Sequence, residues 1–148
     1  MTKVCVFFGH RLVLDEEKIK AKLQKTVRDL IQKGVDTFWL GGYGEFDEMA
    51  EQVTLDLKHE FPHIQRVFAL AYLPKNKEDY LYMEKLYDFM FYPEGVEVGP
   101  KKFAITRRNK YLAEHADIVV AYVTGESGGA YQALKYAQKL NKKIILVK

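Results

Sequence analysis

Five short apolar runs, rich in β-branched and aromatic residues, recur along the chain. They occupy positions 3–8, 36–40, 66–72, 117–123 and 142–147. Each run is continuous in apolar residues instead of alternating with polar ones. Such runs are typical of strands buried on both faces, as in a parallel sheet covered by helices. We therefore predict a buried strand in each run.

Helical repeats separate these runs. The first has apolar residues three and four positions apart, at Ile19, Leu23, Val27, Leu30 and Ile31. The acidic residues at 15–17 suit its N-terminus and Gly34 suits its C-terminal turn. Similar repeats occupy 49–57, 105–116 and 130–140. Strands that alternate with helices indicate a parallel α/β sheet, because parallel neighbours need crossover connections.

The segment between Pro74 and Pro100 mixes both periodicities and is crowded with aromatic residues. We interpret it as a helix near 79–86 followed by a short strand near 88–92. The predicted fold is therefore an α/β domain with an open, mostly parallel sheet of about five or six strands and helices on both faces.

Composition fits one domain over residues 1–148. The chain has 148 residues, 48% of them hydrophobic, which is enough for one full core but short for two. Lys and Arg number 23 against 20 Asp and Glu, an excess too small to indicate nucleic acid by itself. The lone Cys5 lies in an apolar run and is expected to be a buried thiol. Without a signal peptide pattern or a membrane-length apolar run, we expect a soluble cytoplasmic protein.

Three glycine-marked loops follow predicted strands, at 9–11, 41–48 and 124–131. In an open parallel sheet these loops meet at the carboxyl edge, where ligands bind. Two of them lead into helices, whose free N–H groups and positive dipole end attract anions, typically phosphate. Neither matches the dinucleotide or nucleoside triphosphatase glycine motif. Each glycine alone is better explained by a tight turn, but the two clusters together favour a binding site.

Several side chains near these loops have two interpretations each. Asp47 either caps a helix or accepts a hydrogen bond from a ribose hydroxyl. His10 and Arg11 are either solvated or, in the case of Arg11, a phosphate clamp. Arg107, Arg108 and Asn109 are consecutive, so they cannot all face one pocket from a helix.

Four segments carry a resemblance to a known superfamily. They are FFGHR at 7–11, GGYGEFD at 41–47, KFAITRRNKYLAEHADIVVAYV at 102–123 and GGAYQALKYAQ at 128–138. The chain resembles the SLOG superfamily, the Rossmann-like fold of the cytokinin-activating "Lonely Guy" phosphoribohydrolases and of a DNA-processing protein, and is most similar to a small bacterial and phage branch. The resemblance implies a single Rossmann-like domain whose pocket over these loops binds nucleotides or nucleotide-derived ligands.

The chain departs from the phosphoribohydrolases at the catalytic position. Their arginine is kept, because Arg108 stands four residues before Leu112, where they have methionine. Their loop P-G-G-x-G-T-x-x-E ends on a catalytic glutamate, but here Ala130 replaces the threonine and Ala133 the glutamate. An alanine cannot relay a proton, so that hydrolase mechanism does not carry over. Asp47 and Glu126 are the candidate substitutes.

Three hypotheses for function follow. The first is a protein that binds a nucleotide or nucleotide-derived small molecule, as a sensor or a sequestering protein. The second is an enzyme that cleaves an N-glycosidic or phosphate bond of a nucleotide. The third is a module that binds single-stranded DNA through the basic residues Lys101, Lys102, Arg107, Arg108 and Lys110. The candidate ligand-binding residues are Gly9, His10, Arg11, Gly41, Gly42, Gly44, Phe46, Asp47, Arg108, Asn109, Ser127, Gly128, Gly129 and Ala130.

The sequence gives weaker indications of metals, cofactors and protein partners. The four histidines lack metal-ligand spacing, so we expect no metal, and no cofactor motif is present. The chain has 10 Tyr and 9 Phe, which pack a core, stack on a base or form a dimer surface. We expect a homo-oligomer and no membrane association.

Overall fold

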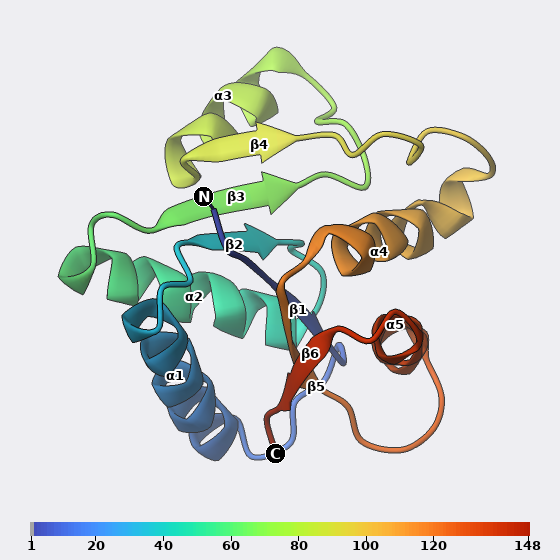
Figure 1. Ribbon diagram of the computed structural model, residues 1–148. Coiled ribbons are helices and arrows are strands. Elements are labelled where there is room, and N and C mark those ends of the chain that lie inside the picture. Colours follow the sequence, from blue (N-terminus) through green and yellow to red (C-terminus); the bar gives the residue numbers. More distant parts are fainter. Residues whose placement is uncertain (1) are drawn as a thin grey trace.

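All strands run parallel in one six-stranded sheet of the order β4-β3-β2-β1-β5-β6 (Figure 1). This is a computed structural model, and it describes residues 2–148. The strands are β1 (Val4–Gly9), β2 (Thr37–Leu40), β3 (Gln65–Ala69), β4 (Phe89–Phe91), β5 (Ile118–Tyr122) and β6 (Lys143–Leu146). The five strands predicted from apolar runs are confirmed, and so is the short sixth strand near 88–92.

Helices cover both faces of the sheet. They are α1 (Glu16–Gln32), α2 (Glu45–Glu60), α3 (Lys77–Leu86), α4 (Ala104–His115) and α5 (Gly129–Lys139), with a short 3-10 turn η1 (Lys101–Phe103) before α4. The helices α1 and α2 lie on one face and α4 and α5 on the other, while α3 lies beside β4 (Figure 1). No described helix is long and apolar enough to cross a membrane.

The strand β1 shows why the apolar runs are continuous. Cys5 and Phe7 belong to the core under α1 and α2, whereas Val4, Val6 and Phe8 belong to the core under α4 and α5. Successive side chains point to opposite faces, so a strand covered on both sides must be apolar at every position. Cys5 is fully buried, and this burial raises the pKa of its thiol, which confirms a core role.

The chain changes direction across the sheet next to β1. Strands β2, β3 and β4 follow on one side of β1, and β5 and β6 lie on its other side. The helix that follows β1, α1, lies on one face of the sheet and the helix that follows β5, α5, lies on the other, which leaves a crevice at the carboxyl ends of these two strands. This is the topological switch point, where open α/β sheets bind ligands.

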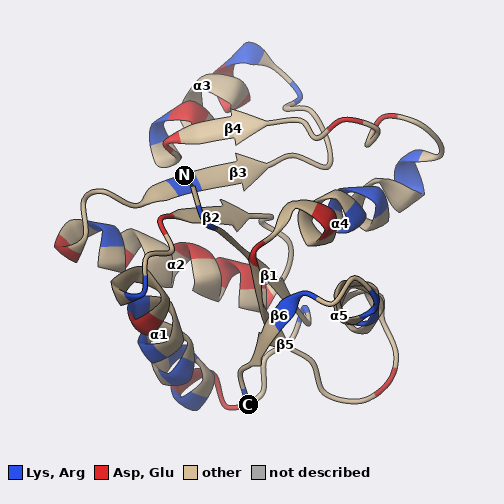
Figure 2. Cartoon of the chain, viewed as in Figure 1, with Lys and Arg blue, Asp and Glu red and all other residues tan. Residues whose placement is uncertain are grey.

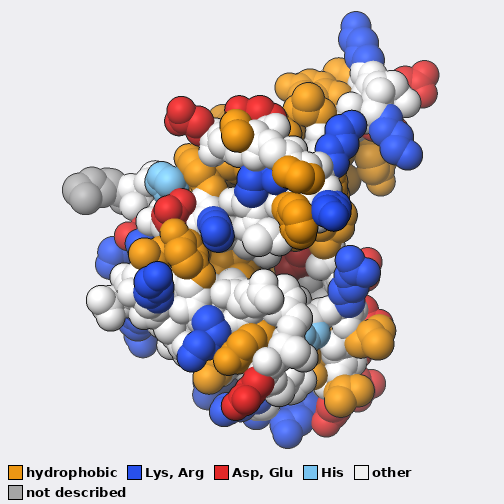
Figure 3. Space-filling view, turned by 90° about the vertical axis from the view of Figure 1, so that its right-hand side faces the viewer, with side chains coloured by type: hydrophobic (Ala, Val, Ile, Leu, Met, Phe, Trp, Pro, Cys, Tyr) orange, Lys and Arg blue, Asp and Glu red, His pale blue; other side chains and the backbone are white. Residues whose placement is uncertain are grey.

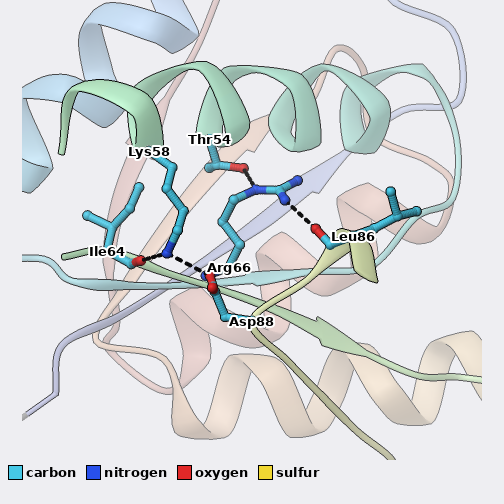
Figure 4. A network of polar contacts seen from close by, with 6 residues as sticks. All are labelled: Thr54, Lys58, Ile64, Arg66, Leu86 and Asp88. Atoms are coloured by element: carbon cyan, nitrogen blue, oxygen red, sulfur yellow. Dashed lines mark hydrogen bonds and ion pairs between the residues drawn. The ribbon is translucent and has the colours of Figure 1, made fainter. Parts of the chain in front are cut away.

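A buried polar network ties α2 to the outer strands (Figure 4). On β3, Arg66 donates hydrogen bonds to Thr54 Oγ1 at 3.0 Å and to the Leu86 carbonyl at 2.7 Å. Nearby, Lys58 Nζ donates to the Asp88 carboxylate at 3.0 Å. The partners of Arg66 lie on α2 and at the end of α3, so this buried charge fixes the edge of the sheet and is separate from the switch point.

The outer edge of the sheet, at β4 and α3, is exposed to solvent. The helix α3 buries none of its residues, and Phe89 on the edge strand β4 is exposed. Unpaired edge strands with apolar side chains are common surfaces for self-association. The homo-oligomer expected from the aromatic residues stays a prediction.

Candidate functional site

Nine of the predicted ligand-binding residues line one open cavity of about 430 Å³ at the switch point. The end of β1, the β2–α2 loop, α4 and the first turn of α5 surround this switch-point cavity. Figure 3 shows this side of the molecule, where Lys and Arg side chains are interspersed with apolar ones. The nine residues are Gly9, His10, Arg11, Asp47, Arg108, Asn109, Gly128, Gly129 and Ala130.

The first turn of α5 offers free backbone donors to the cavity. Gly128 is its N-cap and no side chain caps it. Within the described residues, the N–H groups of Gly129, Ala130 and Tyr131 donate no hydrogen bond. An added Cβ at Gly129 would meet no atom within 4 Å, and Gly129 does not have a positive φ. Neither packing nor backbone conformation requires glycine here, whereas close approach of a ligand to the amides would.

The start of α2 is less suited to this part than that of α5, and the role predicted from sequence for Gly41, Gly42 and Gly44 stays a prediction. The N–H of Glu45 donates to the Arg11 carbonyl at 2.9 Å, and the N–H of Phe46 to the His10 carbonyl at 3.4 Å. The first turn of α2 also carries Glu45, Asp47 and Glu48, whereas the first turn of α5 is free of acidic residues (Figure 2). With two of its first-turn donors occupied and negative charge around it, this helix start is less favourable for an anion than the start of α5.

Phe46, predicted from sequence to contact ligand, does not line the switch-point cavity. Its side chain is fully buried, with its ring stacked on that of Tyr122 at 5.8 Å between centroids. A Cβ added at Gly9 would overlap this ring. Gly9 and Phe46 therefore pack α2 against the end of β1, and Gly9 is glycine because the ring occupies the space of a side chain.

Arg108 supplies a buried positive charge under the cavity. It is 3% exposed, and its guanidinium donates to the Gly41 carbonyl at 2.7 Å and to Asn109 Oδ1 at 3.1 Å. Its Nε has no hydrogen-bond partner, and no described carboxylate forms an ion pair with it. Burial lowers the pKa of Arg108, although guanidinium stays charged in proteins. A buried cation without an ion pair favours an anion in the cavity beside it.

Asp47 lies in the same cavity wall and is also buried, at 9% exposed. Its Oδ2 accepts a hydrogen bond from the N–H of Tyr43 at 2.9 Å. Burial raises the pKa of Asp47 to about 6, against the opposing effects of the Tyr43 hydrogen bond and the Arg108 charge. Both interpretations made from sequence remain compatible with this position, because one carboxylate oxygen orders the loop and the other can accept from a ligand hydroxyl.

The remaining predicted residues divide between the cavity rim and the surrounding loops. His10 Nε2 accepts a hydrogen bond from the N–H of Thr124 at 2.8 Å and so joins the loops that follow β1 and β5. Arg11 is exposed at the rim. Ser127 and Glu126 are exposed in the turn before α5 and do not line the cavity.

Arg107 confirms that the consecutive basic residues diverge. Its Nε donates to the Val96 carbonyl at 2.7 Å and its Nη1 to the Pro100 carbonyl at 2.9 Å. Arg107 therefore holds the loop before α4, while Arg108 points under the cavity.

Tyr43 is a cavity residue that sequence reasoning missed. Its ring lies over the Arg108 guanidinium, with 5.5 Å from Cζ to the ring centroid, and its edge meets Tyr72 at 6.1 Å between centroids. Burial raises the pKa of the Tyr43 hydroxyl. The sequence feature that could have indicated this role is its position inside the glycine loop GGYG, because an aromatic residue in such a loop is not expected to pack in the core.

Replacing Asp47 with Asn should strengthen sulfate binding about fivefold at pH 7.5. At that pH, Asp47 with a pKa of about 6 is ionised. Its negative charge then repels an anion in the cavity and weakens the free energy of anion binding by about 1 kcal/mol. Wild-type affinity should rise as the pH falls through 6, because the carboxyl gains a proton. Sulfate stays dianionic and has no sugar hydroxyl, so it isolates the charge.

Calorimetric titration of both proteins between pH 5 and 8 measures this effect. Other ionisable groups near Asp47, among them Tyr43, Glu51, Arg108 and His10, are the same in both proteins, so the difference between the two pH profiles reports Asp47. Parallel profiles would show that the Asp47 charge does not act on the cavity.

The fold was compared with known protein families, sequences and solved structures. No protein-family model matches the chain. The chain is 26% identical over 141 residues to the uncharacterized SPbeta prophage-derived protein YoqJ of Bacillus subtilis (strain 168), covering 82% of this chain and 81% of that protein. Among solved structures, DNA processing protein A (DprA) of Helicobacter pylori superposes with a TM-score of 0.66 at 16% identity. The Streptococcus pneumoniae protein gives 0.67 at 14% identity.

These superpositions cover 97% and 98% of this chain. The chain has the Rossmann-like fold of DprA. It spans 64% of the Helicobacter chain and 50% of the Streptococcus chain, so each is substantially longer. The Helicobacter protein binds single-stranded DNA. At such low identity the likeness establishes the architecture of the chain and leaves its ligand to be argued from the cavity.

Proposed function

We propose that the switch-point cavity binds the phosphate of a nucleotide. The observation that carries the proposal is the first turn of α5, whose N–H groups are unpaired within the described chain and open onto the cavity at Gly129. The buried Arg108 beside them and the exposed Arg11 at the rim add positive charge. Helix N-termini with free amides and nearby arginines are favourable phosphate sites.

Single-stranded DNA is the favoured source of that phosphate. The Helicobacter relative in fold binds it, and exposed lysines at Lys101, Lys102 and Lys110 lie on η1 and α4 (Figure 2). Arg107 is excluded from this set, because its guanidinium is used by the loop at 96–100. If the three lysines each neutralise one phosphate, the logarithm of affinity should fall with that of salt with a slope of about −2.

A free nucleotide or nucleotide-derived small molecule, held by a sensor or sequestering protein, is the second source. A cavity of about 430 Å³ is within the range of small-molecule sites. In the resemblance to the Lonely Guy phosphoribohydrolases, the position of the catalytic glutamate is Ala133, which is buried. Asp47 is the acid that remains in the cavity, and its raised pKa keeps bond cleavage as a candidate. Chromatography of nucleotides after incubation, with Asp47→Asn as the inactive control, tests that candidate.

Gly129→Ala separates phosphate binding from stability. The new methyl has free space and an ordinary φ, so the free energy of unfolding should rise by up to about 1 kcal/mol. The same methyl crowds the amides that hold phosphate, so affinity for thymidine 5′-monophosphate and for a labelled deoxythymidine oligomer should fall. Thermal unfolding and fluorescence anisotropy measure the two effects. A more stable variant with unchanged affinity would remove the phosphate from the start of α5.

The two sources are distinguished in the same assay. If single-stranded DNA is the ligand, the oligomer binds more tightly than the monophosphate and its affinity falls steeply with salt. A free-nucleotide protein would bind the monophosphate at least as tightly, and the oligomer would compete poorly.

A further inference from the structure

A second cavity continues the groove beyond the phosphate site. It has a volume of about 550 Å³ and lies between the loops after β2 and β3 and the start of α3. It shares Tyr43 with the switch-point cavity, so one side chain borders both. Tyr72 lines it from the loop after β3, and its ring meets that of Tyr43 edge to face.

The character of this cavity differs from that of the first. Its walls are mainly apolar and aromatic, including Phe68 and Leu70 from below and Tyr82 from α3. Tyr43 and Tyr72 are both 38% exposed, so ring surface is open to a ligand. Lys75 and Asp79 supply polar groups at the margin. A flat ligand with an apolar face and a polar edge fits these walls, and nucleobases have that character.

The separation of the two cavities sets the size of the ligand. The phosphate site follows β5, whereas Tyr72 follows β3, and these strands are three places apart in the sheet. Three inter-strand spacings amount to about 14 Å. A mononucleotide does not span that distance, but two linked nucleotides do.

We infer that the Tyr43–Tyr72 cavity is a nucleobase site, which takes the base of a nucleotide adjoining the one whose phosphate is held at α5. The inference rests on the proposed function, and it makes a linked strand of at least two nucleotides, and not a free mononucleotide, the ligand that fills the groove. Stacking on an aromatic ring tolerates every base, so this site adds affinity with little sequence preference.

The test compares Tyr72→Leu with Tyr72→Phe. Both variants lose the hydroxyl that donates to the Lys101 carbonyl at 3.0 Å, but only the phenylalanine keeps the ring. Affinity is measured for thymidine 5′-monophosphate and for a 5′-phosphorylated deoxythymidine octamer, with thermal unfolding as the check on folding. Tyr72→Leu should weaken octamer binding about 5- to 150-fold, the range for one base stacked on an aromatic side chain, and leave monophosphate binding unchanged. Tyr72→Phe should bind both as the wild type does.

Three results would overturn the inference. Octamer binding unchanged in Tyr72→Leu, or equal losses for octamer and monophosphate, would mean that the ring is no base site. Equal losses in the leucine and phenylalanine variants would assign the effect to the hydroxyl. In each of these cases the wild type still binds, so the phosphate site stands. A wild-type protein that binds neither probe would remove the phosphate site and the base site together.

Discussion

Arg108→Met should lower the affinity for sulfate about 100-fold. The substitution removes the buried positive charge beside the cavity, together with the Nε that has no partner in the described chain. Hydrogen bonds to charged groups contribute about 1.5–3 kcal/mol, and 1.4 kcal/mol changes an equilibrium constant tenfold. The carbonyl of Gly41 also loses its donor, so the variant should be less stable, and binding is to be measured well below its unfolding temperature. Calorimetric titration with sulfate gives the affinity directly.

Arg107→Met is the matched control for this prediction. It makes the same replacement one residue earlier on α4, where the guanidinium binds the carbonyls of Val96 and Pro100 and does not line the switch-point cavity. Sulfate affinity should stay as in the wild type. Equal losses in the two variants would mean that general positive charge on α4, and not the buried Arg108, attracts the anion.

Gly9→Ala should lower the free energy of unfolding by about 3 kcal/mol. The added Cβ would overlap the ring of Phe46, which is fully buried and stacked on Tyr122. Forcing an atom into a packed core costs about 1–3 kcal/mol, and the upper end applies here because both rings and the β1 backbone are held in the core. Urea unfolding followed by circular dichroism measures the loss.

Gly129→Ala, at another glycine of the same cavity, should raise the free energy of unfolding where Gly9→Ala lowers it. Both glycines line it, but the space at Gly129 is open whereas that at Gly9 is filled. If Gly9→Ala unfolds at the wild-type urea concentration, the packing of α2 against the end of β1 is looser than described, and the role assigned to Phe46 fails.

The fold could be predicted from sequence because both of its periodicities are strong. Strands covered on two faces require continuous apolar runs, and the helices α1, α2, α4 and α5 repeat apolar residues toward one face. Even the segment at 79–92, where the periodicity is weak, was correctly predicted to form a helix and a strand, which are α3 and β4. Their exposed positions explain why that segment was harder to interpret, since α3 buries no residue and has little amphipathic pattern.

The site was harder to predict because a glycine loop has the same appearance whether its amides are free or used. The starts of α2 and α5 are both preceded by glycines, yet two first-turn amides of α2, those of Glu45 and Phe46, already donate to carbonyls. In the described chain the first three amides of α5 donate no hydrogen bond. The carbonyls that occupy α2 belong to His10 and Arg11, which are more than thirty residues away in sequence. The three acidic residues in the first turn of α2 were the feature of the sequence that argued against an anion site there.

Long-range packing also determined two individual residues. Phe46 follows the glycine loop directly, but it is buried because Gly9 on another strand leaves space for its ring. Asp47, next to it, is buried in the cavity wall, and its raised pKa depends on burial that no local pattern encodes. Tyr43 and Tyr72 meet only because their strands are neighbours in the sheet.

The most direct test of the phosphate site is a titration of the isotope-labelled protein with thymidine 5′-monophosphate, followed by amide nuclear magnetic resonance. Binding at the start of α5 should move the backbone amide signals of Gly129, Ala130 and Tyr131 most, together with the Nε–H signal of Arg108. The amides of Glu45 and Phe46, already donating to carbonyls, should move little. The largest shifts at α2 with none at α5, or no saturable shift at either helix, would contradict the site.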